Sequence, residues 1–183
     1  MTKIDDRFSA YTNNILDLKD AGKDLDRRNV TRSRILKVFE SLPPDVLDLF
    51  LSGSRNFKIL IVPDPGLPFG MKTRAHVSSI GLIYTISICD EAQDWPEDHF
   101  MGSVFRELGH VVAELPPEEE WPLNRGARAR FKEQAECRAD ALVWSWGLRH
   151  YDIIFLSATY PSHWVDKIVN DISLMLLSEF NKN

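Results

Sequence analysis

The spacing of apolar residues predicts helices towards both ends of the chain and strands between them. In the helical stretches an apolar side chain recurs every three or four residues, which places these side chains on one helix face. The predicted helices cover residues 4–20, 30–40, 97–114, 125–146 and 162–180, and a further short helix opens at Pro43-Pro44, runs through Leu51 and is ended by Gly53. The predicted strands cover residues 57–62, 72–79 and 82–89, and a loop is expected at 90–96. Helices, then a small sheet, then helices are the order of an α+β protein.

The last predicted strand, LIYTISIC at residues 82–89, shows the clearest alternation of side chains. Bulky apolar residues stand at every second position, as expected when successive side chains point to opposite faces of a sheet. These residues are Leu82, Tyr84, Ile86 and Ile88. We expect a small, mostly antiparallel sheet with residues 82–89 at its edge.

The length of 183 residues is enough for one well-buried core, so a single domain covering 1–183 is expected. A hydrophobic fraction of 44% and a charged fraction of 27% are those of an ordinary globular protein. Within this domain we distinguish a helical part (1–55), a central part (57–147) and a helical C-terminal part (148–183). No repeat or low-complexity linker divides them.

The net charge of −5 argues against a nucleic-acid partner, because phosphate binding needs clustered basic residues. A local basic stretch at 125–132 is interpreted as the solvated start of a helix. The two cysteines, Cys89 and Cys137, indicate a reducing compartment. The first residues lack a signal-peptide pattern, and no run approaches the roughly 20 apolar residues that span a bilayer. We therefore expect a soluble, cytoplasmic protein without a membrane partner.

The predicted helix 97–114 carries the sequence R-E-L-G-H at residues 106–110. Zinc peptidases carry H-E-x-x-H on a helix, where two histidines bind zinc and the glutamate activates the bound water. Glu107 and His110 stand at the positions of that glutamate and of the second histidine. Arg106 stands at the position of the first histidine, and a guanidinium has no lone pair to give to a metal.

The next predicted helix carries E-C-R-A-D at residues 136–140, where Glu136 and Asp140 are neighbours on one face. With the strand at 82–89, the motif helix and this helix in order, the chain resembles the minimal gluzincins of the ImmA/IrrE metallopeptidase type. Those proteins have a strand, a helix with H-E-x-G-H or a close variant, and a later helix with E-x-x-A-D/N. The resemblance covers about residues 57–147.

This resemblance implies a minimal zincin-like fold, in which a small sheet packs against the motif helix and the long helix after it. It implies that Glu107 is the general base, that His110 and Glu136 are zinc ligands, and that Asp140 supports a ligand. His110 and Glu136 should then face one another across a cleft bordered by strand 82–89. A glycine inside a helix costs about 1 kcal/mol relative to alanine, so Gly109 should lie where another backbone comes close.

Arg106 departs from the family pattern at a zinc ligand. Carboxylates that converge on a half-buried place raise each other's pKa, and a guanidinium can neutralise them through paired hydrogen bonds. We interpret Arg106 as a charge substitute for the metal, within hydrogen-bonding reach of Glu136, Asp140 or Glu107. It cannot act as a Lewis acid or generate hydroxide near neutral pH.

Other residues are weak replacements for the missing ligand. Cys137 points about 100° away from Glu136 around the helix, and His99 stands about 16 Å from His110 by helix rise. His76 stays open, because the sequence does not fix its depth. A simpler interpretation is also open, in which His110 is a core histidine and the acidic residues only pair with nearby arginines.

The sequence thus favours a degenerate zinc-metallopeptidase-like protein without competent zinc hydrolysis, acting as a peptide-binding, protein-binding or regulatory protein. No cofactor is expected, and the peptide is expected to add to strand 82–89 by β-augmentation. One alternative is an active zinc-dependent metallopeptidase with an unrecognised substitute ligand. Another is a structural domain with a vestigial site. Trp144 and Trp164 are expected in the core.

Overall fold

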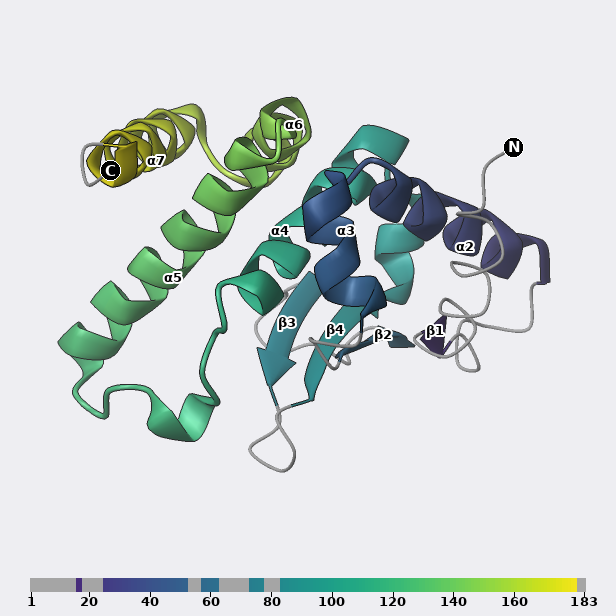
Figure 1. Cartoon of the computed structure of the whole chain (residues 1–183), viewed down its shortest axis with the longest axis horizontal. Coiled ribbons are helices and arrows are strands. Elements are labelled where there is room, and N and C mark those ends of the chain that lie inside the picture. Colours follow the sequence, from purple (N-terminus) through teal and green to yellow (C-terminus); the bar gives the residue numbers. More distant parts are fainter. Residues whose placement is uncertain (1–15, 18–24, 53–56, 63–72, 78–82, 181–183) are drawn as a thin grey trace. The chain divides into compact units, whose positions relative to one another are not determined.

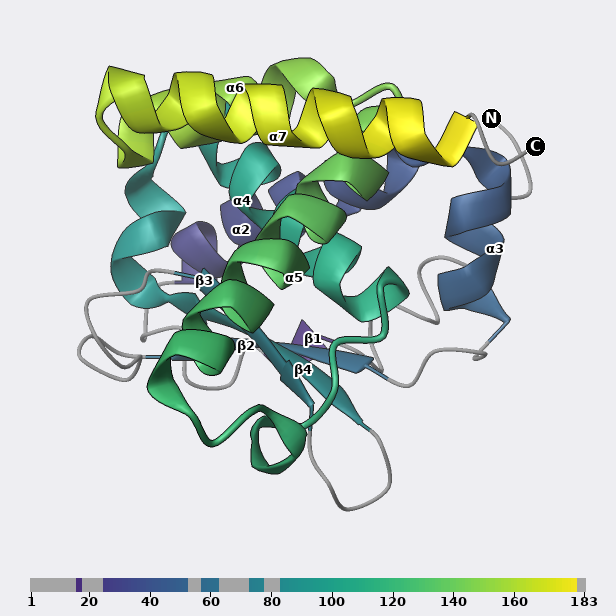
Figure 2. The ribbon, with the colours of Figure 1, turned by 90° about the vertical axis from the view of Figure 1, so that its left-hand side faces the viewer.

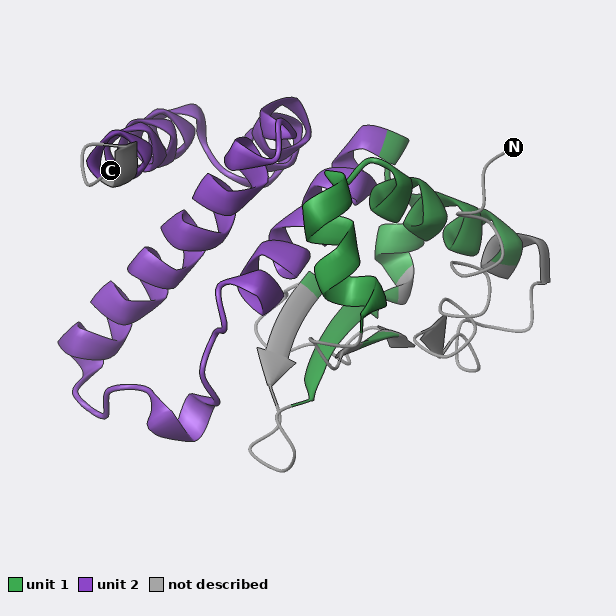
Figure 3. Ribbon diagram, viewed as in Figure 1, with its two compact units in different colours: residues 1–97 green, residues 98–183 purple. Residues whose placement is uncertain are grey.

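The fold is described here from a computed structural model (Figure 1, Figure 2). The structure describes residues 16–17, 25–52, 57–62, 73–77 and 83–180. The chain forms two compact units, residues 1–97 and 98–183 (Figure 3). The boundary falls in the first turn of α4 (Glu97–Val112), inside the part expected to form a zincin-like core. The single domain expected from the sequence stays a prediction.

The first unit contains a four-stranded sheet of mixed direction. Its strands are β1 (Leu16–Asp17), β2 (Phe57–Val62), β3 (Thr73–Val77) and β4 (Tyr84–Cys89). The order is β1-β2-β4-β3, in which β2 is parallel to both β1 and β4, and β3 is antiparallel to β4. Helices together with this sheet give the α+β class, whereas the zincin-like fold remains a prediction.

Two expectations about the sheet are wrong. The sheet is not mostly antiparallel, and β4 is not an edge strand, because β2 and β3 pair with its two sides. Five of the six β4 residues are buried, including Ser87 on the polar side of the alternation. Burial on both faces is typical of an inner strand of a parallel sheet. Alternation of side chains therefore located the strand without showing its neighbours or its direction.

The helices of the first unit follow the apolar pattern closely. The predicted helix 30–40 is the second part of α2 (Leu25–Glu40), and Pro44 begins α3 (Pro44–Leu51), where a proline needs no hydrogen-bonding N–H. The helix expected at 4–20 is wrong at residues 16–17, which form β1, and its other residues lie outside the described part.

A buried arginine joins α2 to the segment after β4. That segment is a 3₁₀ helix, η2 (Asp90–Asp94), inside the expected loop 90–96. Arg34 donates hydrogen bonds to the carbonyl oxygens of Gln93 (2.7 Å) and Trp95 (2.6 Å). Thr31 donates to the Gln93 side chain at 2.7 Å. These bonds satisfy polar groups that would be costly to bury without partners.

The second unit is helical in its described residues. It contains nearly all of α4, the 3₁₀ turn η3 (Glu118–Glu120), α5 (Arg125–Ser145), α6 (Arg149–Thr159) and α7 (Ser162–Phe180). Figure 2 shows α7 lying across α5 and beside α6. Ala141, Trp144 and Ile172 are buried between α5 and α7, with partly buried apolar side chains around them. The expectation that Trp144 belongs to the core is confirmed.

Helix α6 was missed by sequence reasoning. Gly147, with φ of +80°, ends α5, and α6 begins two residues later. A positive φ is easily adopted only by glycine, so this residue is a clear signal that α5 stops. The four apolar residues 153–156 stand side by side in the sequence and show no helical period, which hides the helix.

Two glycines bring α4 close to the helices that follow it. A Cβ atom at Gly109 would lie 2.7 Å from the carbonyl oxygen of Ala139 in α5, and one at Gly102 would lie 2.3 Å from that of Tyr151 in α6. The close backbone approach expected at Gly109 is therefore present. Gly102, Arg106 and Gly109 are separated by four and three residues, so they share one face of α4.

We expect Gly109→Ala to destabilise the protein by about 1–2 kcal/mol, measured by denaturant unfolding. In an exposed helix the same change stabilises by about 1 kcal/mol, but the added methyl group would meet backbone atoms, and overpacking costs about 1–3 kcal/mol. Gly126→Ala, near the start of α5, is the control, because the nearest atom is the Asn124 side-chain oxygen at 3.4 Å. Equal effects of the two changes would contradict this explanation.

Candidate functional site

Helices α4 and α5 bring four of the predicted site residues together. Arg106 and His110 are one turn apart on α4, and Glu136 and Asp140 are one turn apart on α5, so each pair lies on one helix face. His110 Nε2 lies 3.1 Å from Glu136 Oε2, and Arg106 Nη2 lies 3.1 Å from the same oxygen. The expectation that His110 faces Glu136 is confirmed.

Arg106 is a buried cation between two carboxylates. It donates from Nε to Asp140 Oδ1 at 2.5 Å and from Nη2 to Asp140 Oδ2 at 3.2 Å, while Nη2 also contacts Glu136. The Arg106 side chain is 8% exposed and that of Asp140 is fully buried. Burial opposes the charged guanidinium, but Asp140 and Glu136 outweigh it and hold the pKa of Arg106 well above its usual value. The hydrogen-bonding reach expected for Arg106 is thus observed with two of its three candidate partners.

Glu136 is the more accessible carboxylate of the site, with 49% of its side chain exposed. Burial of its carboxyl group favours the neutral form, but Arg106 and His110 outweigh this effect and lower the pKa of Glu136 to about 2. Glu136 in turn raises the pKa of His110 against the opposing effect of burial. Glu136 therefore carries a full negative charge near neutral pH.

Glu107 and the second nitrogen of His110 complete the predicted set. Glu107 is buried on α4, and its negative charge adds to the rise in the His110 pKa. His110 Nδ1 is buried and has no hydrogen-bond partner among the described residues. The roles of Glu107 as a general base and of His110 and Glu136 as zinc ligands stay predictions.

The contacts of these residues do not fit a zinc site. The carboxylate of Glu136, the expected ligand, already forms an ion pair with Arg106, and a permanent cation would repel Zn²⁺ at that distance. Within the described part of the chain, no group of three or more His, Cys, Asp or Glu side chains is arranged to hold a metal ion. We therefore derive no chemistry through zinc at this site.

The three weaker ligand candidates gain no support from the described residues. The His99 ring packs 5.5 Å from that of Phe155. Burial raises the pKa of Cys137 to about 11, which keeps its thiol protonated. His76 lies in β3 opposite Thr85 of β4, and its side chain is outside the described part.

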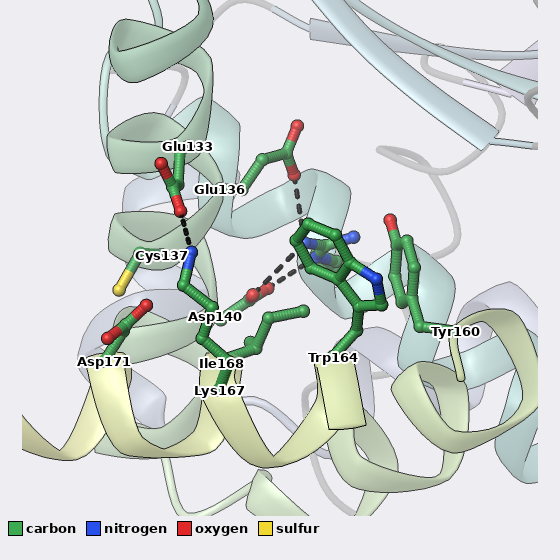
Figure 4. A pocket seen from close by; sticks show the side chains of 10 residues that line it. Glu133, Glu136, Cys137, Asp140, Tyr160, Trp164, Lys167, Ile168 and Asp171 are labelled. Carbon is green, nitrogen blue, oxygen red and sulfur yellow. Dashed lines mark hydrogen bonds and ion pairs between the residues drawn. The ribbon is translucent and has the colours of Figure 1, made fainter. Parts of the chain in front are cut away.

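A cavity of about 160 Å³ adjoins the ion pairs that Arg106 forms with Asp140 and Glu136 (Figure 4). We call it the α5–α7 pocket; its lining includes Arg106 of α4, Glu133 and Glu136 of α5, Tyr160 at the end of α6, and Trp164 and Asp171 of α7. The expectation that Trp164 belongs to the core is wrong, because 49% of it is exposed. The helical spacing located Trp164 on the inner side of α7 without showing that it stands at the rim of a cavity.

Another buried carboxylate, Asp152 on α6, was not recognised in the sequence. It is fully buried, accepts a 2.7 Å hydrogen bond from Trp144 Nε1, and its Oδ1 has no partner among the described residues. Burial first, and then the negative charge of Asp140, raise the pKa of Asp152 to about 7. Its only sequence signal is a lone acidic residue before the apolar run at 153–156.

Comparison with known proteins leaves the resemblance as a prediction. No protein-family model, curated protein or solved structure matches this chain. Of the helices in the described part, none is long and apolar enough to cross a membrane.

Proposed function

We propose that this protein binds a peptide or protein segment, and that it is a degenerate relative of the zinc metallopeptidases without competent zinc hydrolysis. The observation that carries the proposal is the position of the Arg106 guanidinium. It stands where the first zinc-binding histidine would stand, and it bonds Glu136 and Asp140. This cation balances the carboxylates as a metal would, which is the role that we assign to it.

Charge balance alone does not supply hydrolytic chemistry. A zinc peptidase needs a metal that lowers the pKa of its bound water and polarises the scissile carbonyl. A guanidinium can donate hydrogen bonds but cannot bind water as a Lewis acid does. With Arg106 in place, Glu107 would have no activated water to deprotonate. The proposal therefore assigns recognition, rather than cleavage, to this site.

The proposed binding surface differs from the one expected from the sequence. Strand β4 has partners on both sides, so it has no free edge for β-augmentation. The α5–α7 pocket offers an alternative, because exposed aromatic and charged side chains meet there beside Arg106. Aromatic side chains combined with a few charged groups are typical of recognition sites.

Binding and cleavage can be separated in one experiment. We expect members of a random peptide library to be retained on the immobilised protein equally well with EDTA and with added zinc, and mass spectrometry should find them uncleaved. Zinc-dependent cleavage that is lost on chelation and in Glu107→Gln would contradict the proposal. That result would establish the alternative, an active metallopeptidase with a substitute ligand. Failure to retain any peptide would also contradict the proposal and favour a vestigial site.

A further inference from the structure

The size of the α5–α7 pocket limits what it can take. Sites that hold a whole small molecule usually measure about 300–1,000 Å³, whereas this cavity measures about 160 Å³. It lies within the second unit, between α5, α7 and the residue that follows α6 (Figure 4). A cavity of this size fits one side chain of a longer ligand.

The charges around the pocket favour a positively charged group. Four acidic and two basic residues line it, which leaves two negative charges in excess. Both basic residues are already paired: Arg106 with Asp140 and Glu136, and Lys167 with Glu133. In the described part of the chain, the Asp171 carboxylate and Glu136 Oε1 have neither a hydrogen bond nor an ion pair.

Aromatic side chains add to this preference. Trp164 is 49% exposed and Tyr160 is 37% exposed, and both line the pocket. The Nζ atom of Lys167 lies 5.6 Å from the centre of the Trp164 ring system, so a cation already occupies one place near this indole. Aromatic faces attract ammonium and guanidinium groups, most strongly where water is partly excluded.

We propose that the α5–α7 pocket takes one basic side chain, lysine or arginine, of a bound peptide, with Trp164 and Tyr160 contacting its aliphatic stem and the negative charge of Asp171 and Glu136 attracting its charged end. This inference rests on the proposed peptide-binding function and names the side chain that such a peptide must carry. A long basic side chain suits a site of this kind, because its apolar stem can pack on rings while its charged end meets carboxylates.

Blocked amino acids test the pocket directly. Nα-acetyl-lysine methylamide and its arginine counterpart should shift the indole N–H signal of Trp164 in ¹⁵N–¹H spectra in a saturable way. The signal is assigned with Trp164→Phe. Nα-acetyl-norleucine methylamide, which has a similar stem and no charge, should leave it in place. A similar shift by the norleucine compound, or no shift by any compound, would overturn the inference.

Two variants of α7 provide a matched pair. Asp171→Asn should weaken binding of the lysine compound by roughly two- to fivefold, the range for a partly exposed ion pair. Asp166→Asn removes the same charge from an exposed position outside the pocket and should leave the affinity unchanged. Equal weakening in both variants would indicate general electrostatic attraction to the protein. It would overturn the proposal that the lysine compound binds in the α5–α7 pocket. Tighter binding of butylammonium than of the lysine compound would indicate that the pocket binds free amines. It would overturn the proposal that the bound group belongs to a peptide.

The library experiment separates this inference from the function on which it rests. If retained peptides are enriched in lysine or arginine and lose affinity in Asp171→Asn, both proposals hold. If peptides are retained without such enrichment, the function stands and the basic side chain is wrong.

Discussion

Replacing Arg106 by alanine is expected to lower the free energy of unfolding by about 3–5 kcal/mol, the range for removing one partner of a buried ion pair. The guanidinium is the cation bonded to the fully buried carboxylate of Asp140, and it makes two hydrogen bonds to it. Without it, Asp140 would remain charged in a water-poor place or take up a proton. Thermal and denaturant unfolding at neutral pH would measure the loss.

Arg138→Ala is the matched control, because Arg138 is exposed on α5 and has no ion pair with a described residue. It should change stability by less than about 0.5 kcal/mol. Adding Asp140→Asn to Arg106→Ala should recover part of the loss, since the amide removes the unbalanced charge. If Arg106→Ala costs the same whether Asp140 is intact or replaced by asparagine, Arg106 acts through packing rather than charge.

Replacing Asp152 by asparagine is expected to stabilise the protein increasingly as the pH rises. The pKa of Asp152 is raised from 3.8 to about 7 in the folded protein, so the folded state holds a proton that the unfolded chain has already lost. The wild type loses about 1.4 kcal/mol of stability for each pH unit between these two pKa values. The total loss reaches about 4 kcal/mol above pH 7. The cost is absent below pH 4.

The asparagine variant avoids this cost and can still accept the hydrogen bond from Trp144. Its stability advantage over the wild type should grow by about 2–3 kcal/mol between pH 5 and pH 8. The raised pKa of His110 also makes stability fall with rising pH, but it acts in both proteins and cancels in the comparison. Asp166→Asn, on the exposed side of α7, should show no such trend. A pH-independent difference for Asp152→Asn would mean that this carboxylate is ionised throughout.

The parts of the fold that depend on one apolar face could be predicted from the sequence. The expected helices 97–114, 125–146 and 162–180 match α4, α5 and α7 to within two residues at each end. The direction and order of the strands could not be predicted, because pairing depends on contacts between segments distant in sequence. Helix α6 was hidden because its apolar residues are consecutive.

For the site too, features that depend on neighbouring positions in one helix could be predicted, whereas features that depend on packing between distant segments could not. The facing of His110 and Glu136 was implied by the resemblance, whereas the partners of Arg106 followed from four-residue spacing on two helices and from the need to balance charge. The pocket could not be foreseen, because it needs α7 beside α5. Nor could the state of Asp152, because a burial-driven pKa depends on packing around the carboxyl group.

The ion pair of Arg106 has a further consequence for how this site is maintained. A metal ion has a dissociation constant, so a metal site is filled or empty according to the supply of that ion. The guanidinium beside Asp140 and Glu136 is part of the polypeptide and arrives with every copy of the chain. Its local concentration is set by the fold, so neither chelators nor metal scarcity can empty its position. The positive charge that balances Glu136 and Asp140 is therefore encoded in the sequence, at position 106, rather than taken up from the surroundings.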